Sequence, residues 1–180
     1  MKYATALVAL SISAAAIIST YAGFTDFVVK GKSMEPAIAA GDKVACDQTT
    51  FINFSPGDIV IYQHPKRAGD LSIKTIVAVG GQSVAMRRGR LSINGRAVDR
   101  KAAAHGHETE TLPNGRQIRT ISASDSSSAS EFAKVKVAAG HVFVMGNNRD
   151  HSIDSRSASA HGSVPVANIV CRASLPTKRG

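Results

Sequence analysis

Four segments beyond residue 57 alternate apolar and polar residues, and this period of two restricts the fold more than any other feature. Successive side chains of a strand point to opposite faces, so such alternation is typical of sheets with one buried face. Pro-Gly, Gly-Gly and Asn-Gly pairs between the segments indicate tight turns. The segments cover residues 58–63, 72–79, 90–95 and 134–146. The chain is therefore expected to be mainly β.

The length and the apolar content fit one packed domain. The chain has 180 residues, of which 43% are hydrophobic, 5% are aromatic and none is Trp, so the core should consist of Val, Ile, Ala and Leu. Within it, residues 99–131 are expected to form a hairpin and loop insertion at the surface. Asn114-Gly115 suits the turn of that hairpin, and the Ser-rich residues 122–130 suit a mobile loop.

The amino-terminal region is the most apolar part of the chain. Between Tyr3 and Phe24 there are 22 residues without a charge, and a helix of that length, at about 1.5 Å per residue, crosses a bilayer core. Residues 1–24 are therefore expected to be a transmembrane anchor ahead of a folded domain over residues 25–180. A cleaved signal peptide is the alternative, because Thr20-Tyr21-Ala22 resembles a cleavage site.

Charge and metal-ligating residues exclude several classes of function. The net charge is +9, but the basic residues are scattered apart from residues 86–90, and no aromatic residues alternate with them to stack on bases. Nucleic acid is therefore not an expected partner. The six histidines show no metal-ligand spacing, so neither a metal nor a cofactor is expected. Cys46 and Cys171 either pair in an oxidising compartment or remain buried thiols.

Two residues, Lys74 and Ser33, stand in positions that suggest a catalytic role as well as a structural one. Lys74 has apolar neighbours on both faces of its strand, and burial of an amine lowers its pKa and frees a lone pair. Ser33 stands before a Met-Glu-Pro turn, and a serine hydroxyl becomes a nucleophile when a nearby base takes its proton. Lys74 is the candidate base. The alternative for Lys74 is an edge-strand lysine with its charge in water. The alternative for Ser33 is an ordinary turn without a catalytic role.

Five stretches, in order along the chain, resemble the sequence boxes of bacterial type I signal peptidases, the Ser/Lys-dyad leader peptidases of the S26 family. These stretches are GKSMEPAIAAGD, PGDIVIYQHP, IKTIVAVGGQSV, the pair LSINGRAV and ETLPNGRQIRTI, and GHVFVMGNNRDHSIDSR. The resemblance implies a signal-peptidase-like fold of antiparallel sheets with one amino-terminal transmembrane helix. By position, it implies that Ser33 is the nucleophile and that Lys74 is the general base.

The last box, residues 146–156, is implied to support this dyad. The serine that aligns with Ser152 hydrogen-bonds the lysine amine in the family and orients it. Asp154 and Arg156 are expected to pair and to stiffen the turn. Three further residues are expected to brace its first half: Asn148, Arg149 and Asp150. For Arg149 and Asp150 the alternative is a charged turn in solvent.

The resemblance implies that a membrane-anchored serine endopeptidase removes signal peptides from secreted preproteins. The Ser33 N–H is the expected oxyanion donor, and Gly31 stands where some relatives carry a second, hydroxyl donor. Met34, Pro36 and Ile38 are expected near the substrate, whose residues before the cut are small. The implied location is the bacterial cytoplasmic membrane, with a single span in the lipid bilayer and the catalytic domain on the outer, periplasmic side.

Three other functions fit parts of the sequence. One is a specialised peptidase that matures a single pilin or conjugation protein. Another is a hydrolase with a triad of Ser33, His151 and Asp154. The third is a membrane-tethered binding module with an idle dyad.

Two departures from the family pattern look related. Many relatives carry Arg after the base lysine and begin the last box with Gly-Asp-Asn, whereas this chain has Thr75 and Asn147 at those positions. Loss of both charges leaves no unpaired charge behind. Thr75 and Asn147 are therefore expected to be neighbours.

Overall fold

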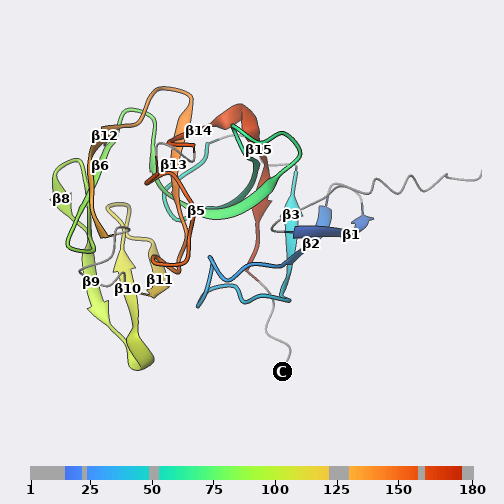
Figure 1. Ribbon diagram of the computed structural model, residues 1–180, viewed down its shortest axis with the longest axis horizontal. Coiled ribbons are helices and arrows are strands. Elements are labelled where there is room, and N and C mark those ends of the chain that lie inside the picture. The colour runs from blue at the N-terminus through green and yellow to red at the C-terminus, as the bar shows by residue number, and fades with distance from the viewer. Residues whose placement is uncertain (1–14, 22–23, 49–52, 122–129, 158–160, 176–180) are drawn as a thin grey trace, which may run out of the picture.

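The computed structural model describes residues 15–21, 24–48, 53–121, 130–157 and 161–175, with side chains described from Asp26 onward. In the described residues its elements are nearly all strands, with short 3-10 helices at Ala104–Gly106 and Val166–Asn168 (Figure 1). The prediction of a mainly β chain is confirmed. The strands are β1 (Ala15–Tyr21), β2 (Phe24–Val29), β3 (Lys43–Asp47), β4 (Ile59–Gln63), β5 (Leu71–Val79), β6 (Ser83–Arg87), β7 (Arg90–Ile93), β8 (Arg96–Ala97), β9 (Asp99–Ala102), β10 (His107–Thr111), β11 (Gln117–Ile121), β12 (Phe132–Lys136), β13 (His141–Met145), β14 (Val164–Pro165) and β15 (Ile169–Ala173).

The strands form three antiparallel sheets. The largest has the order β1-β2-β3-β15-β4-β5-β13-β14, the second β12-β6-β7-β8 and the third β11-β10-β9. All four alternating segments contain strands, and the segment 134–146 holds the end of β12 and all of β13, which are separated by residues 137–140. In the large sheet β5 lies between β4 and β13, so both of its edges are paired. A central position of this kind explains why nearly every β5 side chain is buried.

The expected transmembrane helix over residues 1–24 is not shown. Residues 15–21 form β1, which pairs antiparallel with β2, and residues 1–14 and 22–23 lie outside the described part of the chain. Among the helices of the described residues, none has the length and hydropathy to cross a membrane.

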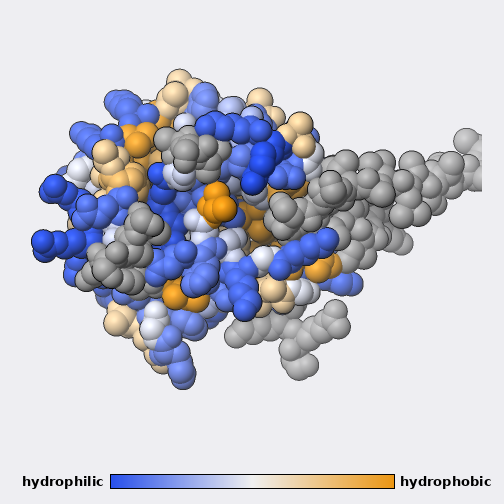
Figure 2. Space-filling model, in the orientation of Figure 1, coloured by the Kyte–Doolittle hydropathy of each residue, from blue (hydrophilic) through white to orange (hydrophobic). Residues whose placement is uncertain are grey.

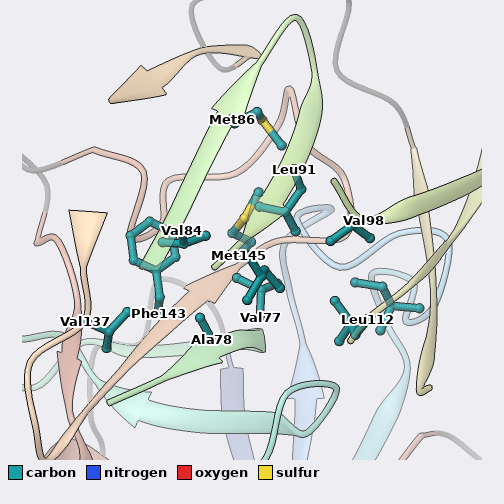
Figure 3. Packing of buried hydrophobic residues seen from close by; sticks show 12 residues of the cluster. Val77, Ala78, Val84, Met86, Leu91, Val98, Leu112, Val137, Phe143 and Met145 are labelled. Atoms are coloured by element: carbon teal, nitrogen blue, oxygen red, sulfur yellow. The ribbon is translucent and has the colours of Figure 1, made fainter. Parts of the chain in front are cut away.

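The buried side chains form three clusters, as the alternation of the strands requires. One of them packs β13 and β5 against β6 and β7, with Phe143 and Met145 facing Val84 and Leu91 (Figure 3). A second cluster packs β2 and β3 against the turn that follows β2, and includes Met34 and Ile38. The face of the molecule in Figure 2 is mostly hydrophilic, with separate hydrophobic spots.

The 99–131 insertion contains the predicted hairpin, β10 paired with β11. Its turn places Gly115 at a φ of +83°, a conformation that glycine adopts without strain. The hairpin is more than a surface excursion, however, because Leu112 and Ile118 are buried in the cluster of Figure 3. The predicted loop at 122–130 lies, except for Ser130, outside the described residues.

A disulfide joins Cys46 on β3 to Cys171 on β15, with 5.5 Å between the two Cα atoms. β3 and β15 are hydrogen-bonded neighbours, which brings the two cysteines within bonding reach. Of the two alternatives that the sequence leaves open, the structure has the paired one.

Candidate active site

Ser33 lies in the turn that leaves the large sheet after β2. The Ile38 N–H donates to the Met34 carbonyl at 3.0 Å, and both of these side chains are fully buried. Their burial fixes the turn on the core while Ser33 stays partly exposed. On the other side, the Ser33 carbonyl accepts a hydrogen bond of 3.0 Å from the Asn148 N–H. The serine is therefore held from two directions.

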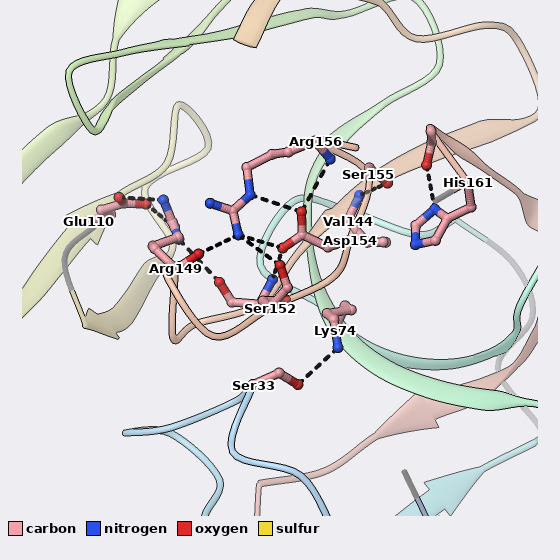
Figure 4. Close-up of polar contacts among 12 residues, drawn as sticks. Ser33, Lys74, Glu110, Val144, Arg149, Ser152, Asp154, Ser155, Arg156 and His161 are labelled. Carbon is pink, nitrogen blue, oxygen red and sulfur yellow. Dashed lines mark hydrogen bonds and ion pairs between the residues drawn. The ribbon is translucent and has the colours of Figure 1, made fainter. Parts of the chain in front are cut away.

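Lys74 Nζ lies 2.9 Å from Ser33 Oγ, which confirms that the two residues expected from the sequence meet (Figure 4). The amine also donates to the Ile73 carbonyl at 2.9 Å. Lys74 is only 5% exposed, because β5 is central in its sheet. Burial lowers the pKa of the amine to about 8; the Asp154 carboxylate opposes this shift and the Arg156 guanidinium adds to it. Near pH 8 much of the amine is uncharged and carries a free lone pair.

Asp154 and Arg156 pair as expected and organise the loop at 146–156. Arg156 donates from Nε and from its second terminal nitrogen to the two Asp154 oxygens, each at 2.9 Å. The Gly146 N–H donates to Asp154 Oδ2 at 2.9 Å, which closes the loop on itself. Burial alone raises the pKa of Asp154, but the bonds and charge of Arg156 outweigh it and lower the pKa below its ordinary value. The carboxylate therefore stays ionised beside the amine.

Gly146 lies where the loop meets Ser33. A Cβ at Gly146 would come within 2.2 Å of Ser152 Oγ and 2.6 Å of the Ser33 carbonyl oxygen, so a side chain does not fit. Ser152 thus places a buried hydroxyl next to the glycine that supports Ser33. Among the described contacts, no hydrogen bond joins this hydroxyl to Lys74, unlike the arrangement that the resemblance implies.

A family model described as "Signal peptidase, peptidase S26" matches residues 1–177. The chain belongs to this family. It is accordingly a serine endopeptidase, a hydrolase, and the resemblance seen in the sequence is confirmed.

Two relatives found by sequence agree with this assignment. Signal peptidase I P of Bacillus subtilis subsp. natto is 29% identical over 136 residues, which are 74% of this chain and 67% of that protein. Signal peptidase I S of Bacillus subtilis strain 168 is 31% identical over 160 residues, or 87% and 78% of the two chains. A solved structure of a signal peptidase I from Enterococcus faecalis V583 aligns with a TM-score of 0.43 and 22% identity, over 67% of this chain and 96% of that one.

The first half of the loop at 146–156 is braced by a residue that the sequence did not indicate. Arg149, expected here, is 2% exposed and makes two hydrogen bonds, of 2.9 and 2.6 Å, with Glu110 on β10 (Figure 4). Asn148 is also buried, whereas Asp150 is exposed. The alternative of a solvated turn is thus wrong for Arg149.

His151 does not complete a triad in the contacts of the described residues. Its Nδ1 lies 3.2 Å from Asn148 Oδ1, and no contact joins the ring to Ser33. Within the described residues there is also no group of three His, Cys, Asp or Glu side chains able to hold a metal ion.

The residues expected near the substrate occupy different surroundings. Met34 and Ile38 lie in the core under the turn. Pro36 lines a cavity of about 1070 Å³ together with Thr75 and Asn147. Gly31 is open, because a Cβ there would meet no atom within 4 Å.

Proposed function

We propose that this protein removes signal peptides from secreted preproteins, with Ser33 as nucleophile and Lys74 as general base. The observation that carries the proposal is the 2.9 Å contact between the serine hydroxyl and a buried amine whose pKa is lowered to about 8. A base with a pKa near the working pH both accepts and returns a proton readily. The names of the relatives, signal peptidase I, support the substrate class.

The reaction follows from the positions of these two groups. Ser33 Oγ attacks the scissile carbonyl carbon while its proton passes to Lys74 Nζ. The tetrahedral intermediate then breaks its C–N bond, and the Lys74 ammonium returns the proton to the leaving amine. Water attacks the resulting ester, again giving its proton to Lys74, and the signal peptide leaves as a carboxylate while Ser33 regains its proton.

The oxyanion of each intermediate needs hydrogen-bond donors. The Ser33 backbone N–H is the first donor in this proposal, since the nucleophile's own amide lies close to the carbonyl under attack. Gly31 supplies no hydroxyl. We further propose that the substrate binds as an extended strand, with small side chains before the cut.

The location proposed is the outer side of the cytoplasmic membrane, with residues 1–24 as the anchor, which requires residues 15–21 to leave their pairing with β2 and to cross the bilayer as a helix. The Cys46–Cys171 disulfide supports an oxidising compartment, because cytosolic thiols are kept reduced. Ser33 is nine positions after Phe24, a reach of about 30 Å at most, so the dyad stays near the end of the anchor. The net charge of +9 suits anionic headgroups. Retention of the full-length chain in membranes after a high-salt wash tests this location, and a mature protein that begins at Gly23 would contradict it.

Cleavage of a preprotein in detergent tests the dyad. Ser33→Ala and Lys74→Ala should each remove nearly all activity, and the double variant should be scarcely worse, because nucleophile and base act as one unit. His151→Ala is the control and should keep most activity. Substantial turnover by Lys74→Ala would exclude the dyad, and a loss in His151→Ala equal to that in Ser33→Ala would favour a histidine base.

A further inference from the structure

Arg149 is a buried cation whose counter-ion comes from outside the catalytic loop. Its two terminal nitrogens bond both oxygens of Glu110, 39 residues earlier, and the two side chains are 2% and 3% exposed. The buried carboxylate within the loop, Asp154, is bonded to Arg156. A buried charge that loses its partner is strongly unfavourable, so Arg149 depends on Glu110 to stay in place.

Arg149 in turn supports the residue on which Ser33 and Ser152 pack. Its Nε donates to the Gly146 carbonyl at 3.1 Å, and Gly146 is the close contact of both serines. The Arg149 carbonyl also accepts a hydrogen bond of 2.6 Å from Arg156, the partner of Asp154. Arg149 therefore connects both ends of the loop at 146–156, through its side chain to Gly146 and through its backbone carbonyl to Arg156.

The backbone of the same hairpin is hydrogen-bonded to the loop. The Ile121 N–H donates to the Asn147 carbonyl at 2.9 Å, and the Arg149 N–H donates to the Ile121 carbonyl at 3.3 Å. Asn147 Nδ2 donates to the Arg119 carbonyl at 2.8 Å. Glu110 thus lies on a hairpin whose position relative to the loop is already fixed, so its carboxylate meets Arg149 in a defined geometry.

We propose that Glu110 is a positioning residue for the reaction, which acts through Arg149 and Gly146 to hold the loop against Ser33. This inference rests on the proposed function of Ser33 and Lys74. The hairpin insertion accordingly contributes to catalysis without touching the substrate or the reacting atoms.

Glu110→Gln tests the proposal, with Glu108→Gln as the matched control. Both residues lie on the same face of β10, but Glu108 pairs with Arg100 inside the insertion, at 3.2 Å. Glu110→Gln should lower kcat about 10- to 100-fold and change KM about twofold at most, because small displacements of catalytic groups slow the chemistry more than binding. Glu108→Gln should keep the wild-type kcat, and Glu110→Asp, which retains the charge, should recover part of the loss.

A second variant separates positioning from stability. Glu110→Gln/Arg149→Met removes both charges, so the melting temperature should return toward that of the wild type. Methionine at position 149 cannot donate the hydrogen bond that Arg149 gives to the Gly146 carbonyl, so kcat should remain low. Recovery of kcat together with the melting temperature would mean that the pair only stabilises the fold, and a wild-type kcat in folded Glu110→Gln would overturn the proposal directly.

Amide hydrogen exchange of residues 146–156 provides a readout that needs no catalysis. Exchange should be faster in Glu110→Gln than in the wild type or in Glu108→Gln. Faster exchange with unchanged kcat would show that the order of the loop does not position the dyad, against the proposal. Undiminished cleavage by Ser33→Ala would instead refute the proposed function, while the exchange data would still report on the link between Glu110 and the loop.

Discussion

Thr75 Oγ1 donates a hydrogen bond to Asn147 Oδ1 across 2.7 Å, and both side chains are buried. The bond joins the residue after the proposed base to the second residue of the loop at 146–156. The two departures from the family pattern are therefore neighbours, as the sequence predicts. Because Asn147 also bonds the Arg119 carbonyl, its amide connects β5, β11 and the loop.

A double-mutant cycle tests whether this pair replaces an ion pair. Thr75→Arg should destabilise, since its charge would enter a cavity that Arg116, Arg119 and Arg172 already line. Asn147→Asp should also destabilise, because its carboxylate would face the Arg119 carbonyl without a proton to donate. Together they should form an ion pair, with a favourable coupling of about 0.5 to 3 kcal/mol in denaturant unfolding.

Thr75→Val combined with Asn147→Asp is the control for this cycle, because valine matches the shape of threonine and brings no charge. That combination should show no rescue. If the effects of Thr75→Arg and Asn147→Asp on the free energy of unfolding add within about 0.5 kcal/mol, the hypothesis that Thr75 and Asn147 together replace an ion pair is wrong.

The rate of cleavage should rise with pH around the pKa of Lys74. Burial lowers that pKa to about 8, so the fraction of free amine increases as pH rises through this value. A plot of kcat/KM, which reports groups of the free enzyme, against pH should therefore have an apparent midpoint near 8, well below the ordinary 10.5 of a lysine. An optimum in acid would contradict a lysine base.

The same shift should appear in stability. Between pH of about 8 and about 10.5 the unfolded chain binds a proton at Lys74 that the folded chain does not, so stability rises with pH. Relative to Lys74→Met, the free energy of unfolding should increase by about 3 kcal/mol across this window. Denaturant titrations at several pH values measure the difference, and parallel pH profiles of the two proteins would show that the amine is not buried in the folded state.

A site residue can be predicted from the sequence only when its contacts produce a recognisable pattern among nearby residues in the chain. Lys74 is found because an alternating apolar strand makes a charge conspicuous, and the Asp154–Arg156 pair is found because its members are two residues apart. Glu110 is missed, since Glu108 and Glu110 on an alternating hairpin read as a solvent-facing edge. Its partner, Arg149, comes from another box, and only the packing of the hairpin onto the loop brings them together.

The amino-terminal region shows a different limit. An uncharged run of 22 residues satisfies the length of a membrane helix, but it has no periodicity that separates a helix from a strand. The structure has β1 over residues 15–21, paired with β2. The two cysteines give no local signal either, because 125 residues separate them and only the pairing of β3 with β15 makes them neighbours.

Loss of the disulfide should lower stability. The bond closes a long loop of the unfolded chain, so the variant Cys46→Ala/Cys171→Ala should lose about 2 to 5 kcal/mol in denaturant unfolding. Reductant should destabilise the wild type and leave the variant unchanged. Equal stability of the wild type with and without reductant would argue against a bond in the protein in solution.

Gly31→Ser should raise activity by adding the donor that this chain lacks. Some relatives carry a hydroxyl two residues before the nucleophile, and a Cβ at Gly31 meets no atom within 4 Å, so serine fits. Loss of one oxyanion donor costs other enzymes about 100- to 1000-fold, and a gain of about tenfold in kcat is expected for a donor in an unoptimised position. KM and the pH midpoint should stay unchanged, because neither substrate side chains nor Lys74 are altered.

Gly31→Ala, which adds the Cβ without the hydroxyl, is the control and should leave kcat at the wild-type value. Equal rates for the Ser and Ala variants would show that position 31 does not face the oxyanion.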